Sequence, residues 1–432
     1  MKKALISALF WGNLLAILYF WWQGSSEFVL SQNISQLLVA LGRVTGLLAE
    51  YFILVELILI SRIPFIEREY GFDVLNKYHR WFGYFLGIFI LSHPILLTYG
   101  YSSLLGLSLK HQFLGFFQSN DIVQAVMGLA IFIFVIIASL PFIRRKLKYE
   151  SWHIMHLFMY VAIALVLSHQ LEATTATHGG GLLYWIILNF TIFGAFGFWR
   201  FLKPLLTFNK HRFFIEKVVK ENDNVVSIYI SGRNMEKFKF ESGQFLNVLF
   251  LNKGFLQPHP FSFSAPYNGK EIRISAKNVG DYTARLESLS IGTKVIIEGP
   301  LGRFTEKASK HNKYLLIAGG IGITPIRSLV ESLTGKNKDT ILIYGARTPE
   351  DAVFKTELEK INANVKYVFS NYEGVDHEKG YIDENKIKNL APDFKERDIY
   401  ICGPTQMMDS IIKTLKHLGV KSSRIHYEKF SF

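Results

Sequence analysis

Six long apolar runs constrain the fold of this chain more than any other feature of its sequence. A helix crosses a bilayer core of about 30 Å with roughly 20 apolar residues, and each run reaches that length. The runs cover about residues 4–22, 36–60, 79–100, 122–142, 152–171 and 182–203. We therefore expect the N-terminal half to form a six-helix transmembrane bundle embedded in membrane lipid.

The first run has two interpretations, because Lys2 and Lys3 precede it as they would precede the apolar core of a signal peptide. Its apolar stretch continues to an aromatic end, Phe20-Trp21-Trp22, with no small-residue cleavage site. Aromatic residues at the end of an apolar run are typical of a helix that stays in the membrane. The sequence favours a retained helix.

Basic residues predict the orientation of the bundle. Lys and Arg gather in the segments after the second, fourth and sixth runs, whereas the alternate loops are nearly free of them apart from Lys110. Because cytoplasmic loops carry the positive excess, we expect both termini and everything after residue 204 on the cytoplasmic side of a plasma membrane. These loops account for part of the net charge of +13, so that charge does not indicate a nucleic acid partner.

The second half of the chain has a different texture. From about Lys210, short runs with alternating apolar residues predict a small antiparallel β-barrel. After Gly302 the order strand, glycine turn, helix repeats, which predicts an α/β domain with a parallel sheet. The expected domains are therefore 1–208, 209–308 and 309–432. The single cysteine, Cys402, excludes an intrachain disulfide and a thiolate-held iron–sulfur cluster.

Five histidines lie in or at the edge of the expected membrane helices. They are His79, His93, His153, His156 and His169. An ionisable group in hydrocarbon is costly and needs a partner, and for any single histidine a backbone carbonyl is a sufficient one. The spacing of the set, however, points to a shared role.

His79 and His93 are 14 residues apart, which is about 21 Å of helix rise, and at ~100° per residue they lie only ~40° from one face. His156 and His169 are 13 apart, at nearly matching depth. The third and fifth helices run in the same direction, so His79 is expected level with His156 and His93 level with His169. Two imidazoles at each of two levels predict two bis-histidine haems stacked across the membrane.

The spacing of 13 residues leaves an ideal helix ~140° off one face, so the fifth helix must bend or bulge, or one ligand must reach round. His153 is an alternative inner ligand, although its spacing of 16 from His169 matches the third helix less well. Arg43, an isolated charge near the outer end of the second helix, also has two interpretations. It extends to the outer headgroups, or it faces the outer haem and holds a propionate or an anionic product.

Two segments of the barrel region suit a flavin. The run His259-Pro260-Phe261-Ser262-Phe263-Ser264-Ala265-Pro266 combines an extended backbone with aromatic, hydroxyl and basic side chains, which can stack on and bond to the ring system. The run Gly280-Asp281-Tyr282-Thr283 is expected to open a helix, where free N–H groups and a hydroxyl favour a pyrophosphate.

A glycine turn after the strand 314–318 is the main nucleotide signal. In Gly319-Gly320-Ile321-Gly322-Ile323-Thr324-Pro325 the glycines follow a strand and precede a helix, as a dinucleotide-binding turn requires. Thr324 suits the N-cap and Pro325 the first helical position, so the helix dipole would point at whatever Gly320 and Gly322 admit.

Three further positions complete the nucleotide signals. Arg347 ends the next strand and suits the 2′-phosphate of NADP, although an exposed arginine can also simply face water. Cys402-Gly403-Pro404 ends the last sheet strand and is followed by a helix over 405–418. Phe432 ends the sequence, and it is either frayed or placed over the flavin face that the nicotinamide must reach.

Taken together, these motifs resemble the NADPH oxidase and ferric reductase superfamily, in particular its minimal bacterial NADPH oxidases. The resemblance runs from Arg43 to Phe432, with the motifs in the family's order. It implies that His259, Pro260, Phe261 and Ser262 hold FAD, with Ser262 near the reactive flavin nitrogen, and that Tyr282 and Thr283 bind its pyrophosphate. It implies NADPH contacts for Gly320, Gly322, Thr324, Arg347, Cys402 and Pro404, and stacking of Phe432 on the isoalloxazine.

Two positions depart from the family pattern. Soluble relatives carry arginine where His259 stands, which puts the phosphate contact there in doubt. Many eukaryotic members carry a polar residue at the position of Leu97, four residues after His93, which leaves Arg43 alone beside the outer haem. The sequence has no EF-hand loop and no proline-rich tail, so activity is expected without calcium or an activator subunit.

The expected function is a transmembrane electron relay. NADPH would reduce FAD, and electrons would pass through the haem of His79 and His156 to the haem of His93 and His169, then to molecular oxygen, giving superoxide. The first alternative uses the same relay to reduce ferric or cupric chelates. The second is a haem module that passes electrons to a protein partner, which the nucleotide motifs disfavour.

Overall fold

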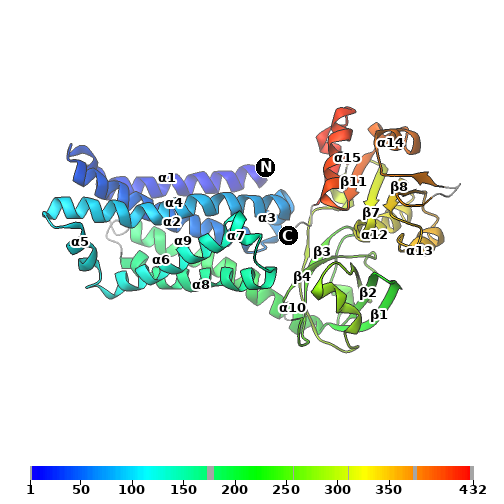
Figure 1. The fold of residues 1–432 in the computed structure, drawn as a ribbon, viewed down its shortest axis with the longest axis horizontal. Coiled ribbons are helices and arrows are strands. Elements are labelled where there is room, and N and C mark those ends of the chain that lie inside the picture. Colours follow the sequence, from blue (N-terminus) through cyan, green and yellow to red (C-terminus); the bar gives the residue numbers. More distant parts are fainter. Residues whose placement is uncertain (1, 173–179, 256, 310, 373–376, 429–432) are drawn as a thin grey trace. The chain divides into compact units, whose positions relative to one another are not determined.

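The computed structural model describes residues 2–172, 180–255, 257–309, 311–372 and 377–428 (Figure 1). These residues form two compact units. The helical unit contains residues 1–62 and 75–198, and the α/β unit contains residues 63–74 and 199–432. We describe each unit separately.

The helical unit is built from six helices long and apolar enough to cross a membrane, as the sequence predicts. They are α1 (Lys2–Leu30), α2 (Ile34–Ile60), α4 (Phe72–Leu105), α6 (Asn120–Ser139), α8 (Tyr149–Glu172) and α9 (Gly181–Gly197). Shorter helices lie between them, namely α3 (Pro64–Tyr70), α5 (Leu109–Phe116) and α7 (Pro141–Arg144). The five-residue π-helix Phe198–Leu202 and α10 (Lys203–His211) follow α9.

Helix α2 supplies much of the core of the helical unit. Side chains such as Leu54 and Leu57 are almost fully buried between neighbouring helices. Helix α1 packs on α2, where the Tyr51 hydroxyl donates to the carbonyl of Phe10 at 2.7 Å. This bond satisfies a buried polar group inside an apolar interface, where leaving it unpaired would be costly.

The first half of the α/β unit contains two antiparallel sheets. One has the order β1 (Phe214–Asn222), β2 (Val225–Ser231), β5 (Ile272–Lys277); the other has the order β4 (His259–Ser262), β3 (Phe245–Phe250), β6 (Val295–Leu301). Isolated bridges between Phe214 and Lys294 and between Phe263 and Ile274 join their edges. The alternating side chains of both sheets fill one apolar core. The expected antiparallel barrel is therefore confirmed.

The second half of the unit is a parallel six-stranded sheet in the order β10-β9-β8-β7-β11-β12. Its strands are β7 (Lys313–Gly319), β8 (Asp339–Ala346), β9 (Val365–Phe369), β10 (Glu378–Lys379), β11 (Asp398–Cys402) and β12 (Ile425–Tyr427). Helices α12 (Ile323–Thr334) and α13 (Lys355–Lys360) bury their apolar sides in one core, and α14 (Glu384–Leu390) and α15 (Thr405–His417) in another. This is the expected α/β architecture.

Two segments that the sequence assigns to the first domain pack within the α/β unit. Glu67 of α3 accepts a hydrogen bond of 3.2 Å from the backbone N–H of Gly302. Arg200 forms an ion pair of 2.9 Å with Glu298 of β6. Residues 63–74 and 199–208 thus belong to the α/β unit, and the domain boundaries at 208 and 308 stay a sequence-based proposal.

Candidate cofactor sites

The four expected haem ligands form two pairs in the helical unit, each joining α4 to α8. The ring centroids of His79 and His156 are 6.0 Å apart, and those of His93 and His169 are 6.2 Å apart. Helix α8 contains no π-helical turn among its described residues, so its two histidines reach these positions without the bulge that their spacing of 13 had suggested.

The separation within each pair fits an iron atom between the rings. An imidazole nitrogen lies about 2 Å from a bound metal ion, and its ring centre lies about 1 Å beyond it. Two imidazoles on opposite sides of one iron therefore have centroids about 6 Å apart. Both pairs have this separation, and among the residues that the structure describes no group of three or more metal-ligating side chains occurs.

The α4 histidines each use Nδ1 for a hydrogen bond within the bundle. His93 Nδ1 lies 2.7 Å from the carbonyl oxygen of Gly42, a group that only accepts, so Nδ1 carries the proton. His79 Nδ1 lies against the carboxylate of Glu56. A proton on Nδ1 leaves the lone pair of Nε2 available for a metal.

The α8 histidines follow the same arrangement. His156 Nδ1 lies 3.3 Å from the hydroxyl of Ser139, and His169 Nδ1 lies 3.2 Å from the carboxylate of Asp121. All four candidate ligands therefore have an oxygen partner on the nitrogen that would face away from the iron. Such partners orient a metal-bound imidazole and strengthen its donor nitrogen.

Gly46 of α2 makes room for the ring of His93. A Cβ atom at this position would lie 2.6 Å from both Nδ1 and Cε1 of the imidazole, which is closer than atoms pack. Sequence reasoning missed Gly46, Glu56, Asp121 and Ser139. Glu56 alone carried a signal, because a carboxylate inside an apolar run needs a partner.

The other two intramembrane candidates have local contacts. His153 stacks on Tyr149, with ring centroids 5.7 Å apart. The guanidinium of Arg43 donates to the carbonyl of Gly24 at 3.1 Å and lies 4.6 Å from the ring centre of Phe28. These contacts hold Arg43 against α1.

The expected flavin segment forms β4, which pairs with β3 so that Phe245 lies opposite Ser262. His259 stacks on Tyr282, with ring centroids 3.5 Å apart. The Tyr282 hydroxyl is buried without a partner among the described residues, and burial raises its pKa. An unpaired buried hydroxyl is costly, so a polar group of a bound ligand such as FAD fits this position.

Two hydroxyls of the flavin motifs have partners inside the protein. Thr283 accepts hydrogen bonds from the backbone N–H groups of Val279 and Gly280, and the helix it opens, α11 (Asp281–Ala284), is only four residues long. The hydroxyl of Ser264 is fully buried and lies 2.8 Å from that of Ser275. Both arrangements fix the backbone of the motif.

The glycine turn and the Cys402-Gly403-Pro404 segment meet at the carboxyl edge of the parallel sheet. Strands β7 and β11 are neighbours there, and the strand order reverses between them. In open α/β sheets, ligands bind outside the carboxyl ends of the strands at such a switch point. A Cβ atom at Gly322 would lie 2.3 Å from the carbonyl oxygen of Cys402, so only glycine allows the two segments this close.

The start of α12 differs from the sequence prediction. The expectation of Thr324 as N-cap and Pro325 as first helical residue is wrong, because the helix begins at Ile323 after a 3₁₀ turn over Gly320–Gly322. The Thr324 hydroxyl donates to the carbonyl of Ile321 at 3.0 Å. Gly320 has a φ of +52°, which favours glycine. The turn continues directly into the helix, so its N–H groups still open toward the switch point.

The remaining nucleotide candidates differ in exposure. Arg347 follows β8 and its side chain is exposed. Cys402 is buried, and burial raises the pKa of its thiol to about 12, with the nearby Glu428 carboxylate adding to the effect. The thiol is therefore neutral at physiological pH. Phe432 lies outside the described residues.

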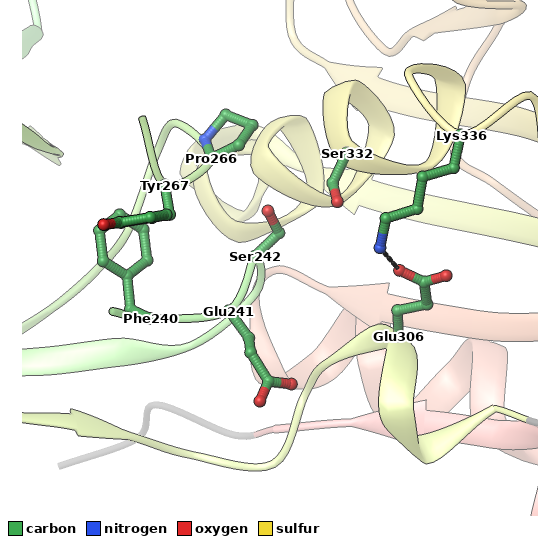
Figure 2. Close-up of a pocket in the computed structure, with 8 residues that line it drawn as sticks. All are labelled: Phe240, Glu241, Ser242, Pro266, Tyr267, Glu306, Ser332 and Lys336. Atoms are coloured by element: carbon green, nitrogen blue, oxygen red, sulfur yellow. Dashed lines mark hydrogen bonds and ion pairs between the residues drawn. The ribbon is translucent and has the colours of Figure 1, made fainter. Parts of the chain in front are cut away.

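A separate small cavity lies where the barrel meets α12 (Figure 2). Its volume is about 190 Å³, and Pro266, the last residue of the expected flavin run, is one of the residues that line it. Lys336 and Glu306 form an ion pair at one side, and Tyr267 lies at the other (Figure 2). The other lining residues belong to none of the expected cofactor motifs.

Three family descriptions match successive parts of the chain. "Ferric reductase like transmembrane component" matches residues 45–167, "FAD-binding domain" matches 210–314 and "Oxidoreductase NAD-binding domain" matches 316–413. The chain has the architecture of the NADPH oxidase and ferric reductase superfamily. The superfamily resemblance drawn from the motifs is thereby confirmed. The matched domains support an oxidoreductase with FAD- and NAD(P)-binding domains, and the six apolar helices indicate a multi-pass membrane protein.

Individual relatives match about half of the length of this chain. The glycine betaine monooxygenase reductase subunit of Chromohalobacter salexigens is 27% identical over 52% of this chain and 65% of its own. A flavohemoprotein of a Burkholderia species is 28% identical over 50% and 58%. The FAD/NAD-binding domain of a nitric oxide dioxygenase from Vibrio cholerae matches 51% of this chain and 99% of its own, at 23% identity and a TM-score of 0.46. The chain thus spans less than two thirds of the length of the Chromohalobacter reductase subunit and of the Burkholderia flavohemoprotein.

Proposed function

We propose that this protein carries electrons from NADPH through FAD and two bis-histidine haems to molecular oxygen on the opposite side of the membrane, producing superoxide. One observation carries the haem part of the proposal. Each of the four histidines bonds an oxygen atom through Nδ1, and the pairs are spaced for a metal between their Nε2 atoms. Any histidine in the membrane needs a polar partner, so the proposal rests on the combination: all four use the same nitrogen, and the two pairs have ring centroids 6.0 and 6.2 Å apart.

The residues of the α/β unit would hold the nucleotides. The strand β4 and Tyr282 fit the flavin, and the turn Gly320–Gly322 with the segment after β11 fits NADPH. Bound FAD would supply the conversion between two-electron nicotinamide chemistry and the single-electron chemistry of haem. We assign the binding of the 2′-phosphate to Arg347, because this exposed residue directly follows β8, the strand next to β7.

The outer pair determines how an acceptor can be reduced. If His93 and His169 fill both axial positions, no acceptor can bind the iron, so electrons would leave across the edge of the site. This supports oxygen or a metal chelate equally well. Arg43 is one residue from Gly42, the partner of His93, and we assign it the stabilisation of an anionic product.

The direction of transfer and the place of Phe432 belong to the same proposal. The basic loops favour a plasma membrane protein whose α/β unit lies on the cytoplasmic side.

Phe432 is assigned to the flavin ring face, where it would control access of the nicotinamide. Its deletion should change the ratio of NADPH to NADH oxidation, and an unchanged ratio would remove this role.

The acceptor is decided by one comparison in a purified, FAD-loaded sample of the full chain. Cytochrome c reduction that superoxide dismutase suppresses is expected with NADPH in air. Capture of Fe(II) from a ferric chelate at a higher rate, with little dismutase-sensitive signal, would instead identify a chelate reductase. A sample that oxidises NADPH only after a protein acceptor is added would contradict both.

A further inference from the structure

A buried ion-pair network joins the barrel to the nucleotide-binding sheet within the α/β unit. Its centre is Glu357 of α13, whose carboxylate oxygen Oε2 lies 2.8 Å from Nη1 of Arg273 and 2.8 Å from Nε of Arg327. Arg273 belongs to β5 of the barrel, whereas Arg327 belongs to α12. One carboxylate therefore bridges two arginines from two different domains.

Both arginines are buried and have further partners. Arg273 also pairs with Glu221 of β1 at 3.0 Å, and Arg327 pairs with Glu331 at 2.8 Å. The exposed fractions of their side chains are only 5% and 8%. A buried guanidinium needs close partners, and two contacts of the Arg327 guanidinium, from Nε to Glu357 and from Nη2 to Glu331, have the distance of an ion pair without the alignment of a hydrogen bond. Although burial alone would raise the pKa of Glu357, Arg273 and Arg327 hold that pKa below its usual range, so the carboxylate stays ionised.

Arg327 makes one contact that connects the network to the flavin segment. Its Nη1 donates to the backbone carbonyl of Ser264 at 2.8 Å. Ser264 is two residues beyond Ser262, the last residue of β4. Its hydroxyl lies 2.8 Å from Ser275, and Ser275 lies 2.7 Å from Ser227. Arg273 donates to Ser227 at 3.4 Å, which closes a ring of polar contacts back to Glu357.

The same arginine lies on the helix that the glycine turn opens. Arg327 is the fifth residue of α12, which begins directly after Gly320–Gly322. One guanidinium thus ties the helix of the nucleotide turn to the end of the flavin strand. The separation of a hydride donor from its acceptor depends on these two segments, and a misplacement of 1 Å can slow a reaction about 100-fold.

We propose that Arg327 is a positioning residue for hydride transfer. Through Ser264 and Glu357 it would fix the position of the glycine turn relative to β4, the strand expected to hold the flavin. This inference rests on the proposed use of NADPH and FAD. Arg327 touches neither reacting atom, so it acts through the backbone it fixes. A lysine cannot replace it, because one ammonium lacks the planar fork that reaches Ser264, Glu331 and Glu357 together.

Arg397 provides a matched control. It is also buried, it pairs with Asp339 at 2.9 Å and with Asp393 at 2.6 Å, and it donates to the carbonyl of Tyr314. All these partners belong to the nucleotide-binding half of the unit. Arg397→Lys should therefore lower the thermal midpoint without changing the relation between the two cofactors.

The test uses the full FAD-loaded chain in detergent and follows anaerobic flavin reduction at saturating NADPH. For Arg327→Lys we expect a rate at least about 10-fold lower, a dissociation constant for NADPH within about 2-fold of the original, and unchanged FAD content. Glu357→Gln should slow the reaction in the same direction, and it tests the inference if Arg327→Lys does not fold. Arg397→Lys should reduce flavin at the original rate.

Amide hydrogen exchange supplies a second readout that needs no turnover. Arg327→Lys should raise exchange in peptides covering residues 259–268, whereas Arg397→Lys should not. Unchanged rate and unchanged exchange in both network variants would overturn the inference, as would equal slowing by Arg397→Lys. If NADPH does not reduce the flavin of the unmodified chain, that result contradicts the proposed function and not this inference. The exchange measurement then still decides the role of Arg327.

Discussion

Nδ1 of His93 donates a hydrogen bond of 2.7 Å to the backbone carbonyl of Gly42, which joins α4 to α2. The bond fixes the tautomer of the imidazole and leaves the Nε2 lone pair available for a metal, and the ring of His169 lies 6.2 Å away, centroid to centroid. An imidazole in hydrocarbon needs such a polar partner. The arrangement is therefore expected to serve the ring of His93.

Replacing His93 by leucine should remove the outer haem alone. Haem content should fall from two to one per chain, and transfer to an external acceptor should cease, while NADPH-dependent dye reduction by the flavin continues. Pyridine haemochrome assay against protein concentration measures the first effect. His153→Leu is the control and should retain both haems; loss of a haem in that variant would make His153, rather than His156, the inner ligand.

Gly46→Ala should also displace the outer haem, although it removes no ligand. The new methyl group would lie 2.6 Å from the ring of His93, which must then move off its hydrogen bond to Gly42. We expect substoichiometric haem and a shifted Soret band. Gly12→Ala is the control, because no atom lies within 4 Å of a Cβ there. Full haem content in Gly46→Ala would show that the site tolerates a displaced ring.

Arg347→Ala should discriminate between the two nicotinamide cofactors. A guanidinium-to-phosphate contact is worth about 1.5–3 kcal/mol, so KM for NADPH should rise by roughly 10-fold or more, while KM for NADH changes by less than about 2-fold. Steady-state dye reduction with each cofactor measures both constants. Equal increases for the two would assign Arg347 to the shared part of the molecule or to the surface.

The single thiol should be unreactive in the folded chain. Alkylation requires the thiolate, and burial raises the pKa of Cys402 to about 12. The thiol of the folded chain therefore stays protonated at pH values at which the thiol of an unfolded chain has begun to ionise. At pH 8 we expect iodoacetamide to modify the folded chain at least 100-fold more slowly than the denatured chain, at roughly the ratio of thiolate fractions. The raised pKa also links the free energy of unfolding to pH. The contribution of the Cys402 thiol is complete below the pKa of the unfolded chain and is lost as the pH rises toward 12. Rapid modification at pH 8 would show that the segment opens.

The helices and sheets could be predicted because their signals are local. Apolar length defines α1, α2 and α9, and the alternation of β2 and β3 defines the barrel. The pairing of His79 with His156 also follows from spacing and chain direction. The start of α12 could not be predicted, because a 3₁₀ turn at Gly320–Gly322 competes with Thr324 for the helix start.

The supporting residues of both sites required the structure. Asp121 and Ser139 are ordinary polar residues at helix ends, and only tertiary packing brings them to His169 and His156. The same is true of Arg327, whose partners Ser264 and Glu357 are 63 and 30 residues away in sequence. Such contacts carry no periodic signal, so a single sequence cannot reveal them.

Haem quantitation in the purified, fully loaded full-length chain tests the relay most directly. The account predicts two b-type haems per polypeptide, with a reduced-minus-oxidised spectrum typical of six-coordinate, bis-histidine iron. A folded, flavin-containing preparation that holds no haem, or whose iron binds carbon monoxide as an open five-coordinate centre would, contradicts the assignment of His79, His93, His156 and His169 as paired axial ligands.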